Sequence, residues 1–256
     1  QIVLQNLEPN RRVWWHDLAR RFRMIRRHRE QANGHRKSRR NVERHYDLSG
    51  SLFDLFLDKE RYYSCAYFRS ETDTLEQAQV QKVAHIAAKL LLRPGMRVLD
   101  IGCGWGGLAI RLARDHGAHV TGVTLSQEQY AFATERVRAM GLQSNVDIQL
   151  KDYRAVSGSF DRIVSVGMFE HVGVPNYRAF FGTVRDLLLP DGVAVIHTIG
   201  RAEPPGATNP FIARHIFPGG YVPAASEVLT AIEQEALWAT DVECLRLHYA
   251  KTLHEW

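Results

Sequence analysis

The sequence has little cysteine and no long hydrophobic run. Its three cysteines, Cys65, Cys103 and Cys244, are widely spaced and lack the paired spacing of zinc ligands. This pattern argues against disulfides and against a metal site, and it predicts a reducing, cytoplasmic compartment. No apolar stretch approaches the ~20 residues that span a bilayer, and none near the start resembles a signal peptide. We therefore expect neither a membrane-spanning protein nor a disulfide-rich secreted one.

Positive charge is concentrated near the start of the sequence. Residues 11–40 contain eleven Arg and one Lys against Asp17 and Glu30, a net charge of +10, whereas the whole chain carries +5. On a helix, at about 100° per residue, large apolar side chains share one arc and arginines the opposite one. The apolar set is Trp14, Trp15, Leu18, Phe22 and Ile25, and the basic set is Arg12, Arg20, Arg23, Arg26 and Arg27. The pattern favours a basic amphipathic arm over residues 1–40 that lies on an anionic membrane surface. Docking of this helix on the rest of the protein, and contact with nucleic acid, are the alternatives.

From about residue 74, helical and strand patterns alternate. The periodicity predicts helices over 75–90, 105–115, 127–140, 177–188 and 225–236, and strands over 96–101, 119–123, 146–150, 160–166 and 193–198. Residues 201–222 read as a long loop or short helices, and residues near 238–250 as β-like. This alternation predicts an α/β fold with a mostly parallel, doubly wound sheet. A helical N-terminal cover, about 41–92, is expected to precede a Rossmann-like core, about 93–256.

The strongest local motif is the run Asp-Ile-Gly-Cys-Gly-Trp-Gly-Gly at residues 100–107, directly after the first predicted strand. Glycines there let the backbone turn sharply and approach a ligand at a helix N-terminus. A nicotinamide enzyme would place an acidic residue at the end of the second strand, but this sequence has Thr124 there. Asp100 before the glycines and Asp152 after the third strand favour S-adenosylmethionine instead. The sequence therefore predicts a class I S-adenosylmethionine-dependent methyltransferase fold, with a dehydrogenase as the weaker alternative.

Ionisable side chains also follow the fourth and fifth predicted strands. Glu170 and His171 come shortly after the fourth, and His197 ends the fifth. Carboxyl ends of neighbouring parallel strands meet at one edge of a sheet, where active sites of this fold class lie. Glu170 and His197 are therefore candidate catalytic residues.

The sequence resembles the cyclopropane-fatty-acid synthases and their mycolic-acid relatives over about residues 41–256. The matching segments are His45–Leu48, Tyr63–Phe68, the glycine run, Thr124–Gln129, Phe169–Gly173, His197–Ile199, Ile216–Gly220 and His248–Leu253. The resemblance implies transfer of the sulfonium methyl of S-adenosylmethionine to a cis double bond of a phospholipid acyl chain. The resulting carbocation is deprotonated by a bound bicarbonate, and the cyclopropane ring closes. Residues 41–256 are thus expected to form the methyltransferase domain.

The resemblance also assigns residues to two sites. Those of the bicarbonate site are Cys65, Glu170, His197, Ile199 (through its backbone) and Tyr249. Those of the cofactor site are Tyr63, Ser64, Gly102, Gly104, Thr124, Leu125, Gln129, Asp152 and Tyr153. Apolar residues that could line a tunnel for the acyl chain are Leu52, Phe53, Leu55, Phe56, Leu57, Phe211, Ile212 and Phe217. A carbocation requires such a dry pocket, because water would quench it.

Three alternatives to cyclopropanation stay open. An acyl-chain methyltransferase that leaves a methylene or methyl branch is barely separated by sequence. An RNA methyltransferase, using the basic arm on phosphates, is disfavoured because the Asn/Asp-Pro-Pro-aromatic signature of base methylation is absent after the fourth strand. A silent lipid-binding protein is disfavoured because both sets of site residues are complete. The expected partners are an unsaturated phospholipid and an anionic membrane surface, with no nucleic acid. The expected location is cytoplasmic, peripheral on the inner face of the membrane, and homo-oligomerisation stays open.

Overall fold

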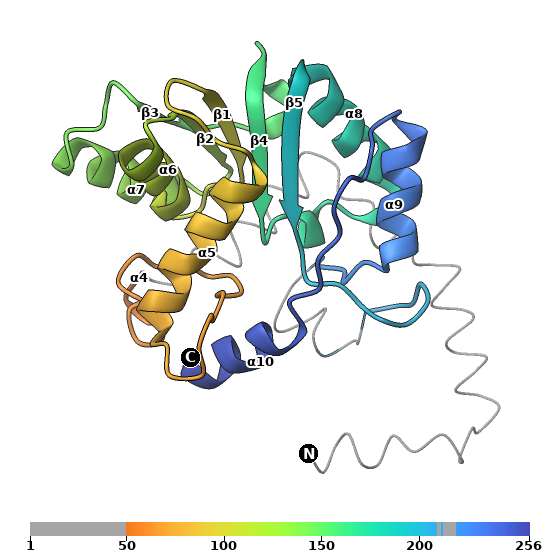
Figure 1. Cartoon of the computed structure of the whole chain (residues 1–256), viewed down its shortest axis with the longest axis horizontal. Helices are drawn as coiled ribbons and strands as arrows, with labels where there is room; N and C mark the ends of the chain where they lie inside the picture. Colours follow the sequence, from red (N-terminus) through yellow and green to blue (C-terminus); the bar gives the residue numbers. More distant parts are fainter. Residues whose placement is uncertain (1–49, 209–210, 212–218) are drawn as a thin grey trace.

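The computed structural model describes residues 50–208, 211 and 219–256 (Figure 1). The predicted arm over residues 1–40 lies outside the described residues. So do three further sets from the sequence analysis, namely His45–Leu48, Ile212 and the residues 216–218. Of the helices in the described part of the chain, none combines the length and the apolar character that a membrane span requires.

A five-stranded sheet with strand order β3-β2-β1-β4-β5 forms the centre of the molecule. The strands are β1 (Arg97–Ile101), β2 (His119–Thr124), β3 (Val146–Leu150), β4 (Phe160–Val166) and β5 (Leu188–His197). Every neighbouring pair is parallel. The order reverses at β1, so the sheet is doubly wound, as the alternating pattern predicted.

Helices cover both faces of the sheet. The α-helices are α4 (Gly50–Phe53), α5 (Leu75–Lys89), α6 (Gly107–His116), α7 (Gln127–Ala139), α8 (Tyr177–Leu187), α9 (Ala225–Gln234) and α10 (Arg246–Glu255), and short 3₁₀ turns are η1 (Tyr153–Ala155), η2 (Phe169–His171) and η3 (Val174–Asn176). One apolar core joins α5, α6 and α7 to one face of the sheet. A second joins α8, α9 and η2 to the other face. Successive residues of β1 enter different cores, since Val98 belongs to the first and Leu99 to the second.

Local sequence signals explain where these elements begin and end. The side chain of Thr74 accepts a hydrogen bond from the Gln77 backbone, and Gln77 returns one, so a capping box starts α5. Helix α6 begins after Gly106, which has a φ of 81°, and is followed by Gly117 in the left-handed region. Helix α5 ends at Lys89 with Leu90 as its C-cap, and Pro94 and Gly95 lie in the turn before β1.

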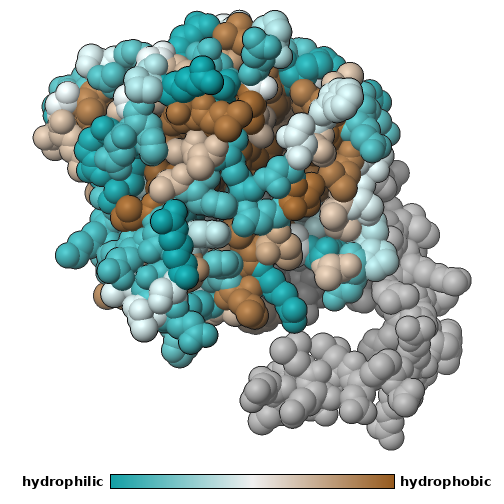
Figure 2. Space-filling view, in the orientation of Figure 1, coloured by the Kyte–Doolittle hydropathy of each residue, from teal (hydrophilic) through white to brown (hydrophobic). Residues whose placement is uncertain are grey.

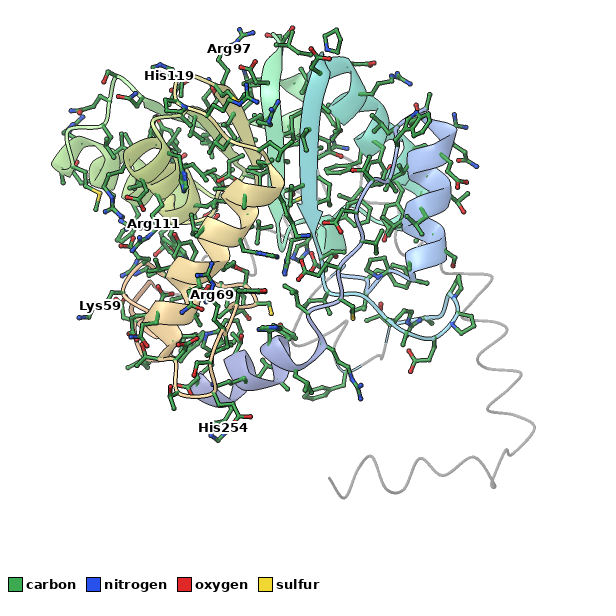
Figure 3. The ribbon with its side chains drawn as sticks, in the orientation of Figure 1. Lys59, Arg69, Arg97, Arg111, His119 and His254 are labelled. Atoms are coloured by element: carbon green, nitrogen blue, oxygen red, sulfur yellow. The ribbon has the colours of Figure 1, made fainter. Side chains whose placement is uncertain are left out.

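The strands point toward one end of the molecule, where α4, α5 and α10 gather (Figure 1). Arg97 and His119, at the starts of β1 and β2, mark the opposite edge (Figure 3). The carboxyl ends of the strands therefore face a layer of helices, and the site described below lies between them.

One predicted element was wrong, and another begins earlier than predicted. The β-like stretch near 238–250 contains no strand: residues 239–245 have no regular structure and α10 follows from Arg246. Strand β5 begins at Leu188, not at Val193, with a shift in its register against β4 between Phe160 and Arg162. The first error matters for the site, because α10 carries Tyr249.

Candidate active site

A cavity opens at the carboxyl ends of β1, β2 and β4. It is lined by the residues of the glycine run, the ends of these strands, and side chains of the segment before α5. Its lining includes Arg61, Tyr62, Tyr63, Ser64, Lys82, Asp100, Thr124, Leu125, Gln129, Lys151, Tyr153, Arg154 and Met168. This is the position in which doubly wound α/β proteins bind their ligands.

The glycine run forms the floor of the cavity in backbone conformations that other residues rarely adopt. Gly102 has a φ of 83° and Gly104 a φ of 54°. A Cβ at Gly102 would lie 2.8 Å from the Met168 side chain, whereas one at Gly104 would meet nothing within 4 Å. Gly102 is therefore required for close packing of the β1 turn against β4, and Gly104 leaves space beside the cavity.

Most of the predicted cofactor residues come together here. Tyr63, Ser64, Gly102, Gly104, Thr124, Leu125, Gln129 and Tyr153 all line the cavity. Thr124 donates to Gln129 at 2.9 Å, which fixes the side chains at the end of β2. Asp152 is not among the described residues that line the cavity. Its carboxylate accepts two hydrogen bonds from the Arg154 guanidinium, at 2.8 and 2.6 Å. The cofactor roles of all nine residues stay predictions.

The segment Tyr62–Phe68, here called the bridging segment, connects the cavity to the helical layer. It has no regular structure, yet its polar groups are bonded to α5 on one side and α10 on the other. Gln79 of α5 donates to the Ser64 carbonyl at 3.2 Å, and Lys82 donates to the Ser64 hydroxyl at 2.8 Å. The Ala66 amide donates to Thr252 of α10 at 3.0 Å. These bonds hold Ser64 and Cys65 between two helices that are remote in sequence.

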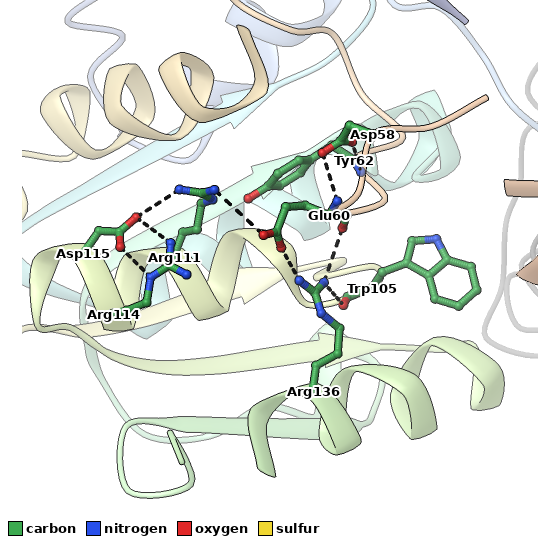
Figure 4. A network of polar contacts seen from close by, with 8 residues as sticks. All are labelled: Asp58, Glu60, Tyr62, Trp105, Arg111, Arg114, Asp115 and Arg136. Carbon is green, nitrogen blue, oxygen red and sulfur yellow. Dashed lines mark hydrogen bonds and ion pairs between the residues drawn. The ribbon is translucent and has the colours of Figure 1, made fainter. Parts of the chain in front are cut away.

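A network of ion pairs anchors the residues that precede the bridging segment (Figure 4). Glu60 is ion-paired with Arg136 of α7, and Arg111 of α6 lies 3.8 Å from its carboxylate. Arg136 also donates to the Trp105 carbonyl at 3.2 Å, within the glycine run. The Tyr62 amide donates to the Asp58 carboxylate at 2.8 Å. The network therefore joins the start of the bridging segment to the glycine run.

Glu170 and His197 present buried polar atoms that lack partners. Glu170 is 7% exposed, and its Oε1 accepts a hydrogen bond from the Ile199 amide at 2.6 Å. Neither Glu170 Oε2 nor His197 Nδ1 has a partner among the described residues. Burial raises the pKa of Glu170, while the Ile199 amide opposes that shift. Burial lowers the pKa of His197 to about 4, so the imidazole is neutral near pH 7.

Cys65 and Tyr249 complete this group. Burial raises the pKa of the Cys65 thiol to about 11, which keeps it protonated. Burial also raises the pKa of the Tyr249 phenol to about 12, and electrostatic interactions with the nearby Tyr63, Glu170 and Cys65 add to the shift. Tyr249 thus lies within electrostatic range of the Glu170 carboxylate and of Cys65. The structure therefore brings predicted anion-site residues from the bridging segment, η2 and α10 to one place.

These atoms suit a small oxyanion with one proton, such as bicarbonate. Buried groups without hydrogen bonds are rare, and each unsatisfied one costs roughly 1–3 kcal/mol. The Tyr249 hydroxyl and Nδ1 of neutral His197, in the tautomer with hydrogen on Nδ1, can donate hydrogen bonds to anion oxygens. Glu170 Oε2 can accept a hydrogen bond from the anion's O–H group. Of the described residues, no group of three or more His, Cys, Asp or Glu is arranged to hold a metal ion.

Sequence reasoning missed Lys82 and Gln79. Both are buried, at 3% and 0% exposure, and both contact Ser64. Charged and amide side chains on an amphipathic helix are usually solvated, so neither was a candidate. A signal was present, because both positions fall within the buried stripe of α5 that also contains Leu75, Ala78, Val83 and Ile86.

Some of the apolar candidates for an acyl tunnel pack against the aromatic rings beside the cavity, and others are exposed on the surface. Phe53 is 3% exposed and packs its ring against Tyr63, with ring centroids 5.6 Å apart. Phe56 contacts the rings of Tyr63 and Trp256. Leu55 and Phe211 are exposed, at 81% and 64%. Apolar side chains also lie in separate patches among hydrophilic ones on the face drawn in Figure 2. The aromatic group beside Tyr63 therefore continues from the cavity toward α4 and α10.

Comparison with known proteins gives consistent results. The family model described as mycolic acid cyclopropane synthetase matches residues 33–256. A probable fatty acid methyltransferase of Pseudomonas putida is 47% identical over 223 residues, 84% of this chain and 56% of that protein. The cyclopropane-fatty-acyl-phospholipid synthase of Escherichia coli K12 is 47% identical over 189 residues, 74% of this chain and 48% of that protein. The chain spans about half the length of these two curated relatives.

Solved structures support the fold. The crystal structure of the mycolic acid cyclopropane synthase CmaA1, complexed with SAH and CTAB, has a TM-score of 0.80 and 38% identity. The similarity covers 85% of this chain and 81% of that one. The predicted Rossmann-like, class I methyltransferase fold is thereby confirmed.

Proposed function

The chain belongs to the mycolic acid cyclopropane synthetase family, and from that premise we propose that it cyclopropanates unsaturated phospholipids with S-adenosylmethionine. The acceptor is the cis double bond of an acyl chain. The observation that carries the proposal is the pair of buried atoms Glu170 Oε2 and His197 Nδ1, which have no partner among the described residues. Gly167, which lines the cavity, donates to the His197 carbonyl at 3.1 Å, so the two parts of the site adjoin.

The residues at the strand ends fit S-adenosylmethionine. Thr124 at the end of β2 offers no carboxylate for the ribose hydroxyls of a nicotinamide cofactor. The turn from Gly102 to Gly104 gives a ligand close access to backbone amides at the start of α6. Tyr63, Ser64, Gln129 and Tyr153 would hold the cofactor from the sides. When bound, S-adenosylmethionine supplies an electrophilic sulfonium methyl group.

The protein's contribution is to keep the reacting carbon dry and to hold one base. An alkene that accepts the methyl group becomes a carbocation, which any water would trap. Aromatic rings of Phe53, Phe56 and Tyr63 exclude water on the side facing α4. Glu170, His197 and Tyr249 would hold a bicarbonate that accepts the proton lost from the new methyl group. Loss of that proton and closure of the C–C bond together give the ring.

A second product fits the same site. If a hydride first shifts from the methyl-bearing carbon to the neighbouring cationic carbon, loss of a methyl proton gives a methylene branch instead of a ring. The similarity to a probable fatty acid methyltransferase favours keeping this candidate. We regard ring formation as the better supported outcome, since the family model and the Escherichia coli relative are both named for cyclopropane synthesis.

We further propose that the protein works on the cytoplasmic face of an anionic membrane. The sequence of residues 11–40 carries a net charge of +10. Each basic side chain near an anionic surface contributes about 1 kcal/mol, screened by salt. Sedimentation with vesicles should show binding that rises with anionic lipid and falls with salt. Equal binding to neutral vesicles would refute the electrostatic part of this proposal.

Titration calorimetry tests the cofactor assignment. We expect binding of S-adenosylmethionine and of S-adenosylhomocysteine, and no binding of NAD. Heat evolved with NAD, and none with S-adenosylmethionine, would overturn the proposed class of enzyme.

A further inference from the structure

Lys82 is a buried cation in the wall of the cavity. It projects from α5, is 3% exposed, and donates from Nζ to Ser64 Oγ at 2.8 Å. Its ammonium also lies over the face of the Tyr62 ring, 4.0 Å from the ring centre, in a cation–π contact. No carboxylate of the described residues forms an ion pair with it, although it interacts electrostatically with Asp58 and, more weakly, with Asp100.

Asp100 is the complementary anion. It is the second-last residue of β1 and is 1% exposed. Its Oδ2 has no partner in the described part of the chain. Burial raises the pKa of Asp100 and lowers that of Lys82. Both shifts report the same physical fact, that each charge is desolvated without a close counter-charge.

Two other charged side chains at the cavity are already paired. Arg61 donates two hydrogen bonds of 2.7 Å to Asp54, and Arg154 is held by Asp152. Lys82 and Asp100 are therefore the buried opposite charges that a ligand could still satisfy. A ligand that carries both a carboxylate and an ammonium group would complement the two together.

The order of the strands places this pair beside β1, away from β3. Thr124 and Tyr153 follow β2 and β3, whereas Asp100 belongs to β1, and Lys82 comes from α5 on the same face of the sheet. A nucleoside held at the ends of β2 and β3 would therefore extend its remaining group toward β1. In S-adenosylmethionine that group is an α-amino acid.

We infer that Lys82 is a binding residue for the amino-acid end of the cofactor. It would act together with Ser64 on the carboxylate, while Asp100 faces the ammonium group. The inference rests on the proposed function, and it explains why a lysine occupies the buried stripe of α5. Because Lys82 also fixes Ser64, cofactor binding is coupled to the position of Cys65 in the bridging segment.

The test compares ligands that differ only at the amino-acid end. Lys82→Met keeps the length of the side chain and removes its charge. S-adenosylhomocysteine retains the amino-acid group, whereas 5′-methylthioadenosine retains the nucleoside and sulfur without it. Calorimetry should show roughly ten- to hundredfold weaker binding of S-adenosylhomocysteine to Lys82→Met, and unchanged binding of 5′-methylthioadenosine. Asp100→Asn should show the same selectivity.

Lys89→Met is the matched control. Lys89 lies two turns further along α5 and forms ion pairs outside the cavity with Asp241 and Glu243. Its replacement should leave both affinities unchanged. An equal loss of affinity for both ligands in Lys82→Met would assign Lys82 a structural role only, and an unchanged affinity for both would remove it from the site. If the wild-type protein binds neither adenosyl ligand, the proposed function itself fails, which separates the two hypotheses.

Discussion

Replacing Glu170 by glutamine tests the proposed anion site with the smallest change in shape. Glutamine keeps an oxygen that can accept the 2.6 Å hydrogen bond from the Ile199 amide. It replaces Oε2, which is buried and lacks a partner among the described residues, by an NH₂ group. The substitution therefore removes the negative charge and reverses one hydrogen bond, while the packing around residue 170 is retained.

The size of the effect follows from this one contact. A hydrogen bond to a charged group contributes about 1.5–3 kcal/mol. If that contact acts only in the transition state, turnover should fall at least roughly ten- to hundredfold, with cofactor affinity unchanged. We expect a larger loss if the bicarbonate no longer binds at all.

The folding stability of Glu170→Gln should not fall with its turnover, and should rise at high pH. Burial raises the pKa of Glu170, so the folded protein binds this proton more tightly than the unfolded chain does. The ionised carboxylate therefore opposes folding, and stability is lost as the pH rises from the ordinary carboxyl pKa through the raised one. Glu170→Gln should be at least as stable as the wild type at pH 8, and this advantage should shrink toward pH 4.

Three measurements on Glu170→Gln separate chemistry from structure: lipid turnover, binding of S-adenosylhomocysteine, and thermal unfolding at several pH values. Glu76→Gln, on the exposed side of the first turn of α5, is the control and should match the wild type in all three. Full turnover in Glu170→Gln would refute the assignment of the base site. A joint fall in Tm and cofactor affinity would instead assign Glu170 a structural role.

Four further substitutions follow from the geometry. Tyr249→Phe, which removes one donor to the anion, should slow turnover less than Glu170→Gln does in the same lipid assay; an equal or larger loss would contradict the assigned order. Gly102→Ala should lower the free energy of unfolding by at least ~1–3 kcal/mol, because its Cβ would lie 2.8 Å from Met168 at a positive φ. Gly104→Ala should lower the free energy of unfolding by less than Gly102→Ala does, and should mainly weaken cofactor binding. Equal unfolding curves for the two variants would refute this difference between the two glycines. The pKa of His197 is lowered to about 4, so its burial as the neutral form costs stability as the pH falls from the ordinary histidine pKa toward that value. His197→Gln should therefore lose less Tm than the wild type between pH 7 and pH 4.5, and parallel curves would show that His197 is not buried in its neutral form.

Much of the sheet could be predicted from sequence because its signals are local. Runs of β-branched residues bounded by Gly or Pro marked the strands, and Thr124 at the end of β2 separated two cofactor classes. Helix α10 was missed for a physical reason. Its inward positions are polar: Thr252 accepts from Ala66, and His248 accepts from the Phe68 amide at 3.0 Å. Leu247 and Leu253 are exposed, so the usual apolar stripe is absent.

The site was only partly predictable for a similar reason. Gly102, Thr124 and Glu170 follow strands, and their position at one edge of the sheet follows from topology alone. Lys82 has no such marker, because its role depends on Ser64 and Asp100, which other parts of the chain supply. Cys65 and Tyr249 were assigned by family resemblance, since no local pattern joins a loop before α5 to a helix near residue 249.

Mass spectrometry of the lipid product tests the central claim most directly. Vesicles of a cis-unsaturated phospholipid, incubated with the protein, S-adenosylmethionine and bicarbonate, should yield an acyl chain with one added CH₂ and no double bond at that position. A product of the same mass that still reacts as an alkene would contradict ring formation. It would replace the proposed cyclopropane synthesis with formation of a methylene branch.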